Sequence, residues 1–211
     1  MKTSEPIVHV VDDDEAVRDS ISMLIDTVGM PHQLHPSADA FLAAYEKDNL
    51  GKRPGCIVLD IRMPGMTGLE LQEALNERHC VLPIIFITGH GDIPMAVEAM
   101  RRGALDFIRK PFSDDDLLER VREALERNVA DRNREGARDA ARAGHAALSP
   151  REKEVFDRVA SGQANKFVAI ELGISERTVE IHRAQVMKKM GARTLAQLVR
   201  MKIDLESQDG G

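Results

Sequence analysis

The sequence predicts two domains: an α/β domain with a doubly wound, five-stranded parallel sheet, and an all-α domain of four helices with a helix-turn-helix. Three observations predict this fold class. Short apolar runs alternate with helical periodicity over residues 1–128, as they do in repeated βα units. Residues 129–147 then lose the apolar pattern. Residues 148–206 contain four helical segments, several of them with strong start signals.

Five apolar runs in the first domain are strand candidates, and each is followed by a helix candidate. The first helix is the clearest, because five apolar residues between positions 17 and 28 form one stripe, which Gly29 can end. Repeated βα units favour parallel strands with right-handed connections. The strands are expected at 7–11, 32–35, 56–59, 83–88 and 104–108, and the helices near 17–28, 38–46, 68–77, 94–102 and 113–128.

The segment 129–147 is expected to link the two domains. Its many Ala and Arg residues favour an exposed helix that continues the preceding one, whereas Gly136 and Gly144 weaken that helix. A flexible tether is the alternative interpretation.

The second domain, residues 148–206, opens on a capping box. Ser149 is the expected N-cap, Pro150 takes the first helical position, and Glu152 follows three residues after the cap. The glycine turn between the next two helices is so short that it indicates a helix-turn-helix. The later helices are expected at 165–172, at 176–190 after the cap Ser175, and after the cap Thr194, and residues 207–211 are expected to form a disordered tail.

Composition sets limits on the class of protein. The 211 residues are 43% hydrophobic, and no apolar run approaches the roughly 20 residues that a membrane span needs. The segment Met1–Pro6 lacks a basic region followed by an apolar core, so we expect no secretory signal and a cytoplasmic location. Cys56 and Cys80 are too few for a disulfide framework and lack metal-ligand spacing, so both are expected to be small buried residues.

The net charge of −6 is unevenly distributed along the chain. Residues 1–112 carry −6, residues 113–147 carry −2, and residues 148–211 carry +2. An acidic first domain argues against nucleic acid as its ligand and suits a cation site. The mildly basic second domain is compatible with nucleic-acid binding.

Carboxylates follow two of the predicted strands at the point where each strand ends. Asp60 directly follows the apolar run 56–59, and Asp12–Asp14 follow the run 7–11. Because ligands bind beyond the carboxyl ends of parallel strands, these side chains are expected to share one crevice. Like charges placed so close repel, and a hard divalent cation such as Mg²⁺ relieves the repulsion. A helix N-terminus favoured by the dipole is the alternative for Asp12–Asp14 alone.

Two further strand ends complete a reactive set. Thr88 offers a hydroxyl group and Lys110 offers an ammonium group. A nucleophilic carboxylate at Asp60, a metal ion, a hydroxyl and an ammonium together describe phosphoryl transfer to a carboxylate.

The first domain closely resembles the receiver domain of two-component response regulators. The resemblance implies a flavodoxin-like sheet with strand order 2-1-3-4-5 and an Asp60 that accepts a phosphoryl group from the phosphohistidine of a sensor histidine kinase. It also implies that Asp13, Asp60 and the backbone carbonyl of Arg62 bind Mg²⁺ directly and that Asp12 acts through water. The segments that carry the resemblance, very specific in order and spacing, are 11–14, 58–65, 87–91 and 106–112.

The same resemblance implies how the phosphoryl group is held and sensed. Thr88 and Lys110 would hold its oxygens, and Phe107 would be the aromatic residue that turns inward with Thr88. The Lys110–Pro111 peptide bond would be cis. No enzyme activity is expected beyond self-phosphorylation from a phosphodonor and slow autodephosphorylation.

The second domain resembles the LuxR-type helix-turn-helix, and the whole chain resembles the FixJ branch of the NarL/FixJ regulators. Residues 88–97 are typical of the FixJ branch in particular. One departure is Phe167, where relatives usually place a polar residue, so Phe167 is expected to pack differently or to sit against the receiver. The segments that carry the LuxR resemblance are 148–152, 165–166, 172–175 and 177–183.

The helix 176–190 is the expected recognition helix. Its spacing turns Val179, Val186 and Met190 toward the core. Glu180 can accept from a cytosine amino group, or it can pair with Arg177 or Arg183 on the helix surface, while Ile181 can contact a thymine methyl group. For His182, a structural hydrogen bond and a phosphate contact are both open. The side chains placed to contact phosphates are Lys166, Arg177, Thr178, Arg183 and Lys188.

These features predict a phosphorylation-dependent transcription regulator. Phosphorylation of Asp60 would alter a face around Val97 and Met100, promote homodimerisation, and place two recognition helices on double-stranded promoter DNA, with RNA polymerase as a further partner. An orphan receiver that acts as a protein interaction module without DNA binding is the alternative. A phosphohydrolase of the haloacid-dehalogenase type is disfavoured, because the acidic run 114–116 opens a helix instead of ending a strand.

Overall fold

The computed structural model describes residues 5–48, 50–89 and 93–207. The chain divides into two compact units, Met1–Arg132 and Asn133–Gly211. Residues 208–211 of the predicted tail and residues 90–92 of the FixJ-like motif lie outside the described residues. Within the described ranges, no helix combines the length and apolar character that crossing a membrane requires.

The first unit contains the predicted five-stranded parallel sheet, with strand order β2-β1-β3-β4-β5. The predicted fold class and strand order are therefore confirmed. For four of the five strands, both ends fall within one residue of the prediction, whereas the fifth strand begins two residues later than predicted. The strands are β1 (Ile7–Val11), β2 (His32–His35), β3 (Gly55–Asp60), β4 (Ile84–Thr88) and β5 (Asp106–Arg109).

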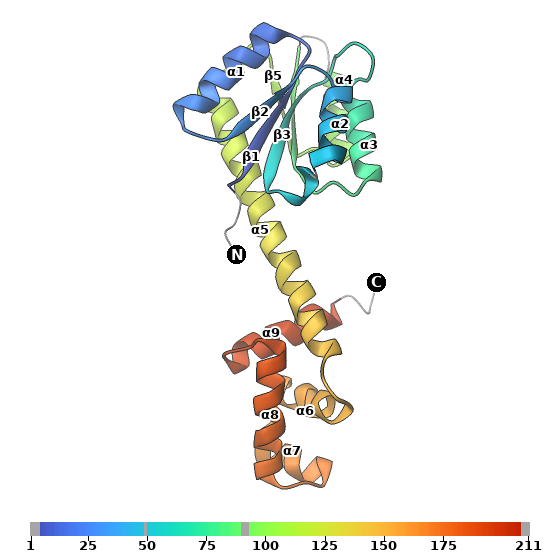
Figure 1. Ribbon diagram of the computed structural model, residues 1–211, viewed down its shortest axis with the longest axis vertical. Coiled ribbons are helices and arrows are strands. Elements are labelled where there is room, and N and C mark those ends of the chain that lie inside the picture. Colours follow the sequence, from blue (N-terminus) through green and yellow to red (C-terminus); the bar gives the residue numbers. More distant parts are fainter. Residues whose placement is uncertain (1–4, 49, 90–92, 208–211) are drawn as a thin grey trace. The chain divides into compact units, whose positions relative to one another are not determined.

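Helices cover both faces of this sheet (Figure 1). Helix α1 and the first part of α5 lie on one face, and α2, α3 and α4 lie on the other. A short 3₁₀ helix, η1 (Leu50–Lys52), precedes β3. The helices are α1 (Glu15–Thr27), α2 (Ala38–Asp48), α3 (Gly68–Glu77), α4 (Ile93–Arg101) and α5 (Asp114–Ala146).

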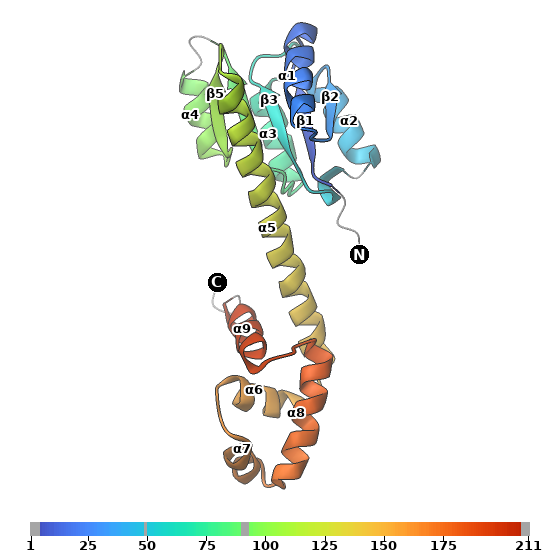
Figure 2. The ribbon, with the colours of Figure 1, turned by 90° about the vertical axis from the view of Figure 1, so that its left-hand side faces the viewer.

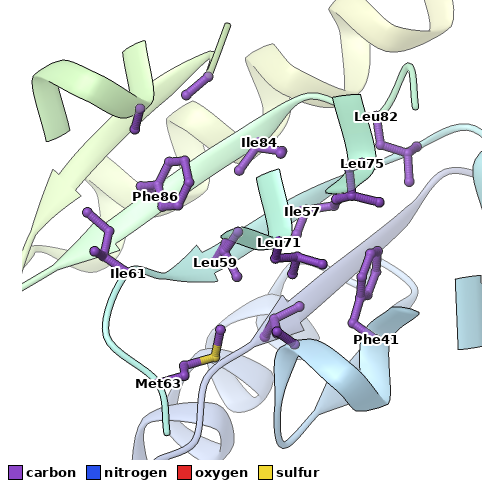
Figure 3. Close-up of a cluster of buried hydrophobic side chains, with 14 of the residues drawn as sticks. Phe41, Ile57, Leu59, Ile61, Met63, Leu71, Leu75, Leu82, Ile84 and Phe86 are labelled. Carbon is purple, nitrogen blue, oxygen red and sulfur yellow. The ribbon is translucent and has the colours of Figure 1, made fainter. Parts of the chain in front are cut away.

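The strands at the centre of the sheet are buried on both faces, which explains their continuous apolar sequences. Figure 3 shows Ile57 and Leu59 of β3 beside Leu71 and Leu75 of α3, with Phe41 of α2 packed at the same layer. Parallel pairing of β1 with β3 and of β3 with β4 holds the ends of these strands in register, so residues that follow the strands meet at one edge of the sheet.

Local sequence explains how the chain leaves β1 and β3. Asp14 is the N-cap of α1, and its carboxylate accepts from the backbone N–H groups of Ala16 and Val17. Thr67 and Glu70 form a capping box at the start of α3. Gly68 is required there, because a Cβ at this position would collide with the carbonyl oxygen of Asp60.

The second unit contains the four predicted helices and the end of α5. Ser149 caps the first of them in the predicted capping box with Glu152. Gly173, with φ +65°, ends α7 and opens the short turn to α8, which Ser175 caps (Figure 2). The helices are α6 (Pro150–Ala160), α7 (Asn165–Leu172), α8 (Glu176–Met190) and α9 (Leu195–Glu206).

The segment 129–147 is helical as far as Ala146, and its two ends belong to different units. Arg132 donates to the carbonyl oxygens of Gly51 and Lys52 in the first unit. In the second unit Ala141 is buried, and a Cβ on Gly144 would lie 2.9 Å from the carbonyl oxygen of Lys189. Small residues make these contacts, which is why no apolar stripe marks this packing in the sequence.

Candidate functional site

Two acidic side chains meet at the carboxyl end of the sheet. Asp60 is the last residue of β3, and Asp12 directly follows β1. Val11 pairs with Leu59 across these neighbouring strands, so the two aspartates lie at the same edge. Asp12 is 1% exposed and Asp60 is 7% exposed. Two carboxylates withdrawn from water at such a position need a cationic partner.

Lys110 supplies that partner. Its Nζ atom donates to Asp60 Oδ1 at 2.7 Å and to Asp12 Oδ2 at 2.8 Å. The backbone N–H of Lys110 donates to the carbonyl oxygen of Thr88 at 2.7 Å, which fixes the residue beside the end of β4. The Lys110–Pro111 bond is cis, as the sequence predicted. Lys110 therefore bridges from the end of β5 to the ends of β1 and β3.

The ionisation of this cluster reflects two opposing effects. Burial raises the pKa of Asp60 and outweighs the opposite effect of Lys110, so the pKa of Asp60 lies above its ordinary value. Burial lowers the pKa of Lys110, but the hydrogen bonds to Asp12 and Asp60 outweigh it, and the pKa of Lys110 is raised overall. The ammonium group therefore stays charged at neutral pH.

Backbone groups hold the other carboxylate oxygens. Asp60 Oδ2 accepts from the backbone N–H of Arg62 at 2.6 Å, and Asp12 Oδ1 accepts from the backbone N–H of Asp14 at 2.9 Å. Arg18 Nη1 donates to the carbonyl oxygen of Asp12 at 2.7 Å. Each aspartate thus directs one oxygen to Lys110 and the other to its own following turn. Arg18 is a site residue that the sequence reasoning missed, although its place on the first turn after Asp12 was a usable signal.

The donor set has the chemistry of a Mg²⁺ site. Asp12 and Asp60 present buried carboxylate oxygens at a strand edge, and the exposed Asp13 stands beside them. The described part of the chain holds no preassembled group of three or more His, Cys, Asp or Glu side chains arranged for a metal. Mg²⁺ keeps several of its waters and binds through one or two carboxylates, so the residues present fit this ion.

Thr88 and Phe107, on neighbouring strands, differ in exposure. Thr88, the last residue of β4, is 4% exposed, and its Oγ1 donates to the carbonyl oxygen of Gly89 at 3.4 Å. Phe107 on β5 is 41% exposed, so it faces outward in this structure. Val97 and Met100, three residues apart on α4, are also exposed apolar side chains.

The burial pattern of α8 agrees with the pattern expected from the spacing of its apolar residues. Val179, Val186 and Met190 are buried as predicted, whereas Ile181 is 56% exposed. Among the described residues, Glu180 forms no salt bridge with any cation, so the predicted alternative of pairing with arginine is absent from this structure. The exposed or half-buried polar set comprises Lys166, Arg177, Thr178, Glu180, His182, Arg183 and Lys188.

Two members of this set have contacts within the protein. Arg183 Nη1 donates to Asn165 Oδ1 at 3.0 Å, which links α8 to the start of α7. The Thr178 hydroxyl lies 2.8 Å from that of the N-cap Ser175. Phe167 on α7 is 62% exposed, so within its own unit it does not pack inward. These helix-linking contacts depend on tertiary structure and were not predictable from the spacing of the residues.

Comparisons with known protein families identify both units. The model described as response regulator receiver domain matches residues 8–122. The model described as bacterial regulatory proteins, luxR family, matches residues 146–202. The first match covers the sheet from Val8 onward with its acidic cluster, and the second covers α6, α7, α8 and α9 as far as residue 202.

Curated relatives resemble the chain over nearly its whole length. The chain is 47% identical to the transcriptional regulatory protein FixJ of Azorhizobium caulinodans over 196 residues, which cover 93% of this chain and 91% of the relative. It is 43% identical to the response regulator protein TmoT of Ectopseudomonas mendocina over 204 residues, which cover 95% of this chain and 90% of the relative.

Solved structures give the same result. The response regulator StyR has a TM-score of 0.79 and 40% sequence identity, with 94% of this chain and 98% of that chain covered. Full-length FixJ from B. japonicum has a TM-score of 0.60 and 40% identity, with 97% of this chain and 99% of that chain covered.

Proposed function

Because the chain belongs to the response regulators that join a receiver domain to a LuxR-type DNA-binding domain, we propose that Asp60 accepts a phosphoryl group from a sensor histidine kinase. The chain is a DNA-binding transcription regulator of a two-component system. The observation that carries the proposal is the buried Asp60 at the carboxyl edge of the sheet, hydrogen-bonded to Lys110 at 2.7 Å. No enzymatic turnover is proposed beyond acceptance of the phosphoryl group and its slow hydrolysis.

In the proposed transfer, a carboxylate oxygen of Asp60 forms a bond to phosphorus while the bond from phosphorus to the histidine nitrogen breaks, and the electron pair stays on that nitrogen. Lys110 moves its hydrogen bond from the Asp60 carboxylate to a phosphoryl oxygen. The hydroxyl of Thr88 donates to another phosphoryl oxygen. Both residues compensate negative charge at the place where it develops.

Mg²⁺ is the proposed cofactor. Asp13, Asp60 and the backbone carbonyl of Arg62 would hold the ion, and Asp12 would act through a bound water. When bound, the ion would supply positive charge that offsets the negative charge of the carboxylate and the phosphoryl group. The buried carboxylates of Asp12 and Asp60 at one edge of the sheet support this assignment.

The response to phosphorylation is proposed to be a shift between two conformations of the receiver. Thr88 would move toward the phosphoryl group, and Phe107, now 41% exposed, would turn inward with it. Val97 and Met100 would then form part of a homodimer face. Their exposure supports this assignment, because a second copy would remove apolar surface from water.

Homodimerisation would place two α8 helices on adjacent half-sites of promoter DNA. Glu180 and Ile181 are proposed to read base edges, and RNA polymerase is proposed as the partner that the bound dimer influences. His182, half-buried on α8, is proposed to contact a phosphate. The side chains proposed to contact phosphates are Lys166, Arg177, Thr178, Arg183 and Lys188.

DNA binding with and without a phosphodonor tests the proposal. Acetyl phosphate with Mg²⁺ is expected to raise the affinity of the full chain for its promoter fragment by about 100-fold or more, since dimerisation makes the second contact intramolecular. Fluorescence anisotropy on genomic promoter fragments measures this change. Asp60→Asn should abolish the gain, and Asp19→Asn, the same change at an exposed residue of α1, should keep it.

A full gain of affinity in Asp60→Asn would contradict the phosphoacceptor assignment. Unchanged promoter binding in Lys188→Ala and Ile181→Ala would contradict the assignment of α8 as the recognition helix, whatever the behaviour of Asp60.

A further inference from the structure

Arg18, half-buried at the start of α1, reaches back to the loop that carries the acidic residues of the site. Its Nη1 atom donates to the carbonyl oxygen of Asp12 at 2.7 Å. Its backbone N–H donates to the carbonyl oxygen of Asp14 at 3.0 Å, and Asp14 is the N-cap of the helix. Arg18 therefore reaches the loop from a backbone that the helix cap holds in place.

Asp12 is held by hydrogen bonds on several sides. Its backbone N–H donates to the carbonyl oxygen of His35, the last residue of β2, at 3.3 Å. Its carboxylate accepts from the backbone N–H of Asp14 and from Lys110 Nζ. Arg18 takes the remaining polar group, which is the carbonyl oxygen. Every polar group of this buried residue thus has a partner, and Arg18 supplies the one on the side of α1.

The carbonyl group of Asp12 belongs to the peptide unit that joins Asp12 to Asp13. A peptide unit is planar, so a hydrogen bond that holds its oxygen also limits rotation of the whole unit. Asp13 is exposed, so packing does little to direct its carboxylate. The orientation of this peptide unit therefore decides where the Asp13 carboxylate can reach.

Neutralisation of the acidic loop is the alternative role for Arg18. Its guanidinium donates to a neutral carbonyl oxygen, although four exposed acidic residues lie within five positions of it in the sequence. The two roles predict opposite effects on a divalent cation. A positive charge beside the site repels a cation, so its removal alone would tighten binding. Loss of a positioning hydrogen bond would weaken binding instead. The four acidic residues are Asp13, Asp14, Glu15 and Asp19.

We propose that Arg18 is a positioning residue of the Mg²⁺ site, because its hydrogen bond to the Asp12 carbonyl oxygen sets the peptide unit from which Asp13 reaches the ion. This role rests on the proposed function, in which Asp13 and Asp60 bind Mg²⁺. Arg18 itself contacts neither the ion nor the phosphoryl group. It acts through the loop, as residues that orient metal ligands do.

Mg²⁺ binding to the unphosphorylated full chain tests this role without a measurement of activity. The ¹⁵N-labelled chain is titrated with MgCl₂ and followed by two-dimensional NMR, and the dissociation constant is taken from the amide shifts of residues 60–63. Arg18→Met removes the donor and should raise the dissociation constant by about tenfold or more. Arg18→Lys keeps a donor and the positive charge, so it should retain most of the affinity.

Arg122→Met, the same change at an exposed residue of α5, is the matched control and should leave the dissociation constant unchanged. The rate of phosphorylation by acetyl phosphate gives a second readout. In Arg18→Met, half of the maximal rate should require about tenfold more Mg²⁺, and the rate at saturating Mg²⁺ should stay the same. A lower rate at saturating Mg²⁺ would overturn the positioning role, because Arg18 would then act on the transfer itself.

The wild-type chain gives a test that does not depend on the folding of a variant. A hydrogen bond from Nη1 slows the rotation of the guanidinium group about its Nε–Cζ bond, and NMR of labelled arginine side chains measures this rotation. With Mg²⁺ bound, the rotation should be about tenfold slower for Arg18 than for Arg122. Equal rotation rates would overturn the proposal.

The outcomes separate this role from the proposed function. If Asp13→Asn and Asp60→Asn lose Mg²⁺ binding but Arg18→Met binds as tightly as wild type or more tightly, only the role of Arg18 is wrong. If Asp13→Asn and Asp60→Asn bind Mg²⁺ as wild type does, the Mg²⁺ assignment itself is wrong. An equal loss of affinity in Arg122→Met would also overturn the role of Arg18, since the loss would not depend on the loop.

Discussion

Each unit of the molecule contains a carboxylate 2.7 Å from a lysine ammonium group, yet the two pairs have opposite character. In the first unit the pair is Asp60 and Lys110, and in the second it is Glu152 and Lys189. The pKa of Asp60 is raised, whereas the hydrogen bonds from Lys189 and from the backbone of Ser149 lower the pKa of Glu152 to about 2. Distance between the charges alone does not decide whether a carboxylate is stabilised.

Burial is the largest cause of the raised pKa of Asp60, and the second acid that shares the same cation raises this pKa further. Lys110 serves both Asp12 and Asp60 at a buried edge of the sheet, so neither carboxylate is fully compensated. Lys189 serves Glu152, which also accepts from the backbone N–H of Ser149 in its capping box. Glu152 is therefore a structural residue. The charge of the Asp60 carboxylate is only partly compensated, so a bound metal ion or a reaction at this carboxylate can stabilise it.

Among the substitutions, removal of the shared cation should give the largest effect. Lys110→Met leaves Asp12 and Asp60 uncompensated, so the first unit should lose about 3–5 kcal/mol of unfolding free energy and the response to acetyl phosphate should disappear. Urea denaturation measures the loss through the fluorescence of Tyr45, because the chain has one Tyr and no Trp. Mg²⁺ should restore part of the stability.

Lys47→Met, on the exposed surface of α2, is the control. An equal loss of unfolding free energy in this variant would show that removal of the shared cation is not the cause.

As the pH falls, the first unit should lose stability at a higher pH than the one at which the ion pair of Glu152 and Lys189 in the second unit is lost. Burial lowers the pKa of His9 and of His35 to about 4, and His9 Nδ1 lies 3.3 Å from His35 Nε2. The unfolded chain binds more protons than the folded chain between pH 6.5 and 4, so stability falls as pH falls through this range. The loss should be on the order of 3 kcal/mol for each imidazole.

The contribution of Glu152 has a different pH window. A lowered carboxyl pKa stabilises the fold above the ordinary value of 4.5, and that contribution is lost as pH falls from 4.5 to about 2. Urea unfolding at a series of pH values, with Tyr45 fluorescence for the first unit and NMR signals for the second, measures both windows. These measurements are best made on the Asp60→Asn chain. The raised pKa of Asp60 makes the wild-type first unit more stable as the pH falls, which opposes the effect of the two histidines. Loss of stability in both units over the same pH range would contradict the comparison.

Asp60→Asn itself should stabilise the first unit by about 0.5–2 kcal/mol, because it removes one of two acids that share Lys110. The same acid-to-amide change in the second unit, Glu152→Gln, should instead destabilise that unit. The glutamine oxygen still accepts from Ser149, but the attraction to Lys189, the largest cause of the lowered pKa of Glu152, is lost. Thermal unfolding of both variants, with the sign of each change as the readout, tests the contrast.

Much of the site could be predicted because strand ends are visible in sequence. Asp12, Asp60, Thr88 and Lys110 each follow an apolar run, and the parallel sheet brings such positions to one edge. The sequence could not show that Lys110 bridges both acids, since this depends on side-chain reach across β4. The roles assigned to these residues stay predictions.

The contacts that small residues make were hidden for a different reason. Ala141 and Gly144 pack within the second unit without an apolar stripe, so periodicity indicated only a linker. The pairing of Arg183 with Asn165 joins two helices at positions 18 residues apart, which no local pattern marks. Hydrophobic periodicity detects large apolar faces and does not detect close backbone approach or helix-linking hydrogen bonds.

Chemical mapping of the phosphorylated carboxylate tests the central claim most directly. The full chain is treated with acetyl phosphate and Mg²⁺ and then with borohydride, which reduces an acyl phosphate to an alcohol, and the peptides are sequenced by mass spectrometry. The account predicts homoserine at Asp60 and unmodified Asp12, Asp13 and Glu152. Homoserine at Asp12 or Asp13 with an intact Asp60 would contradict it.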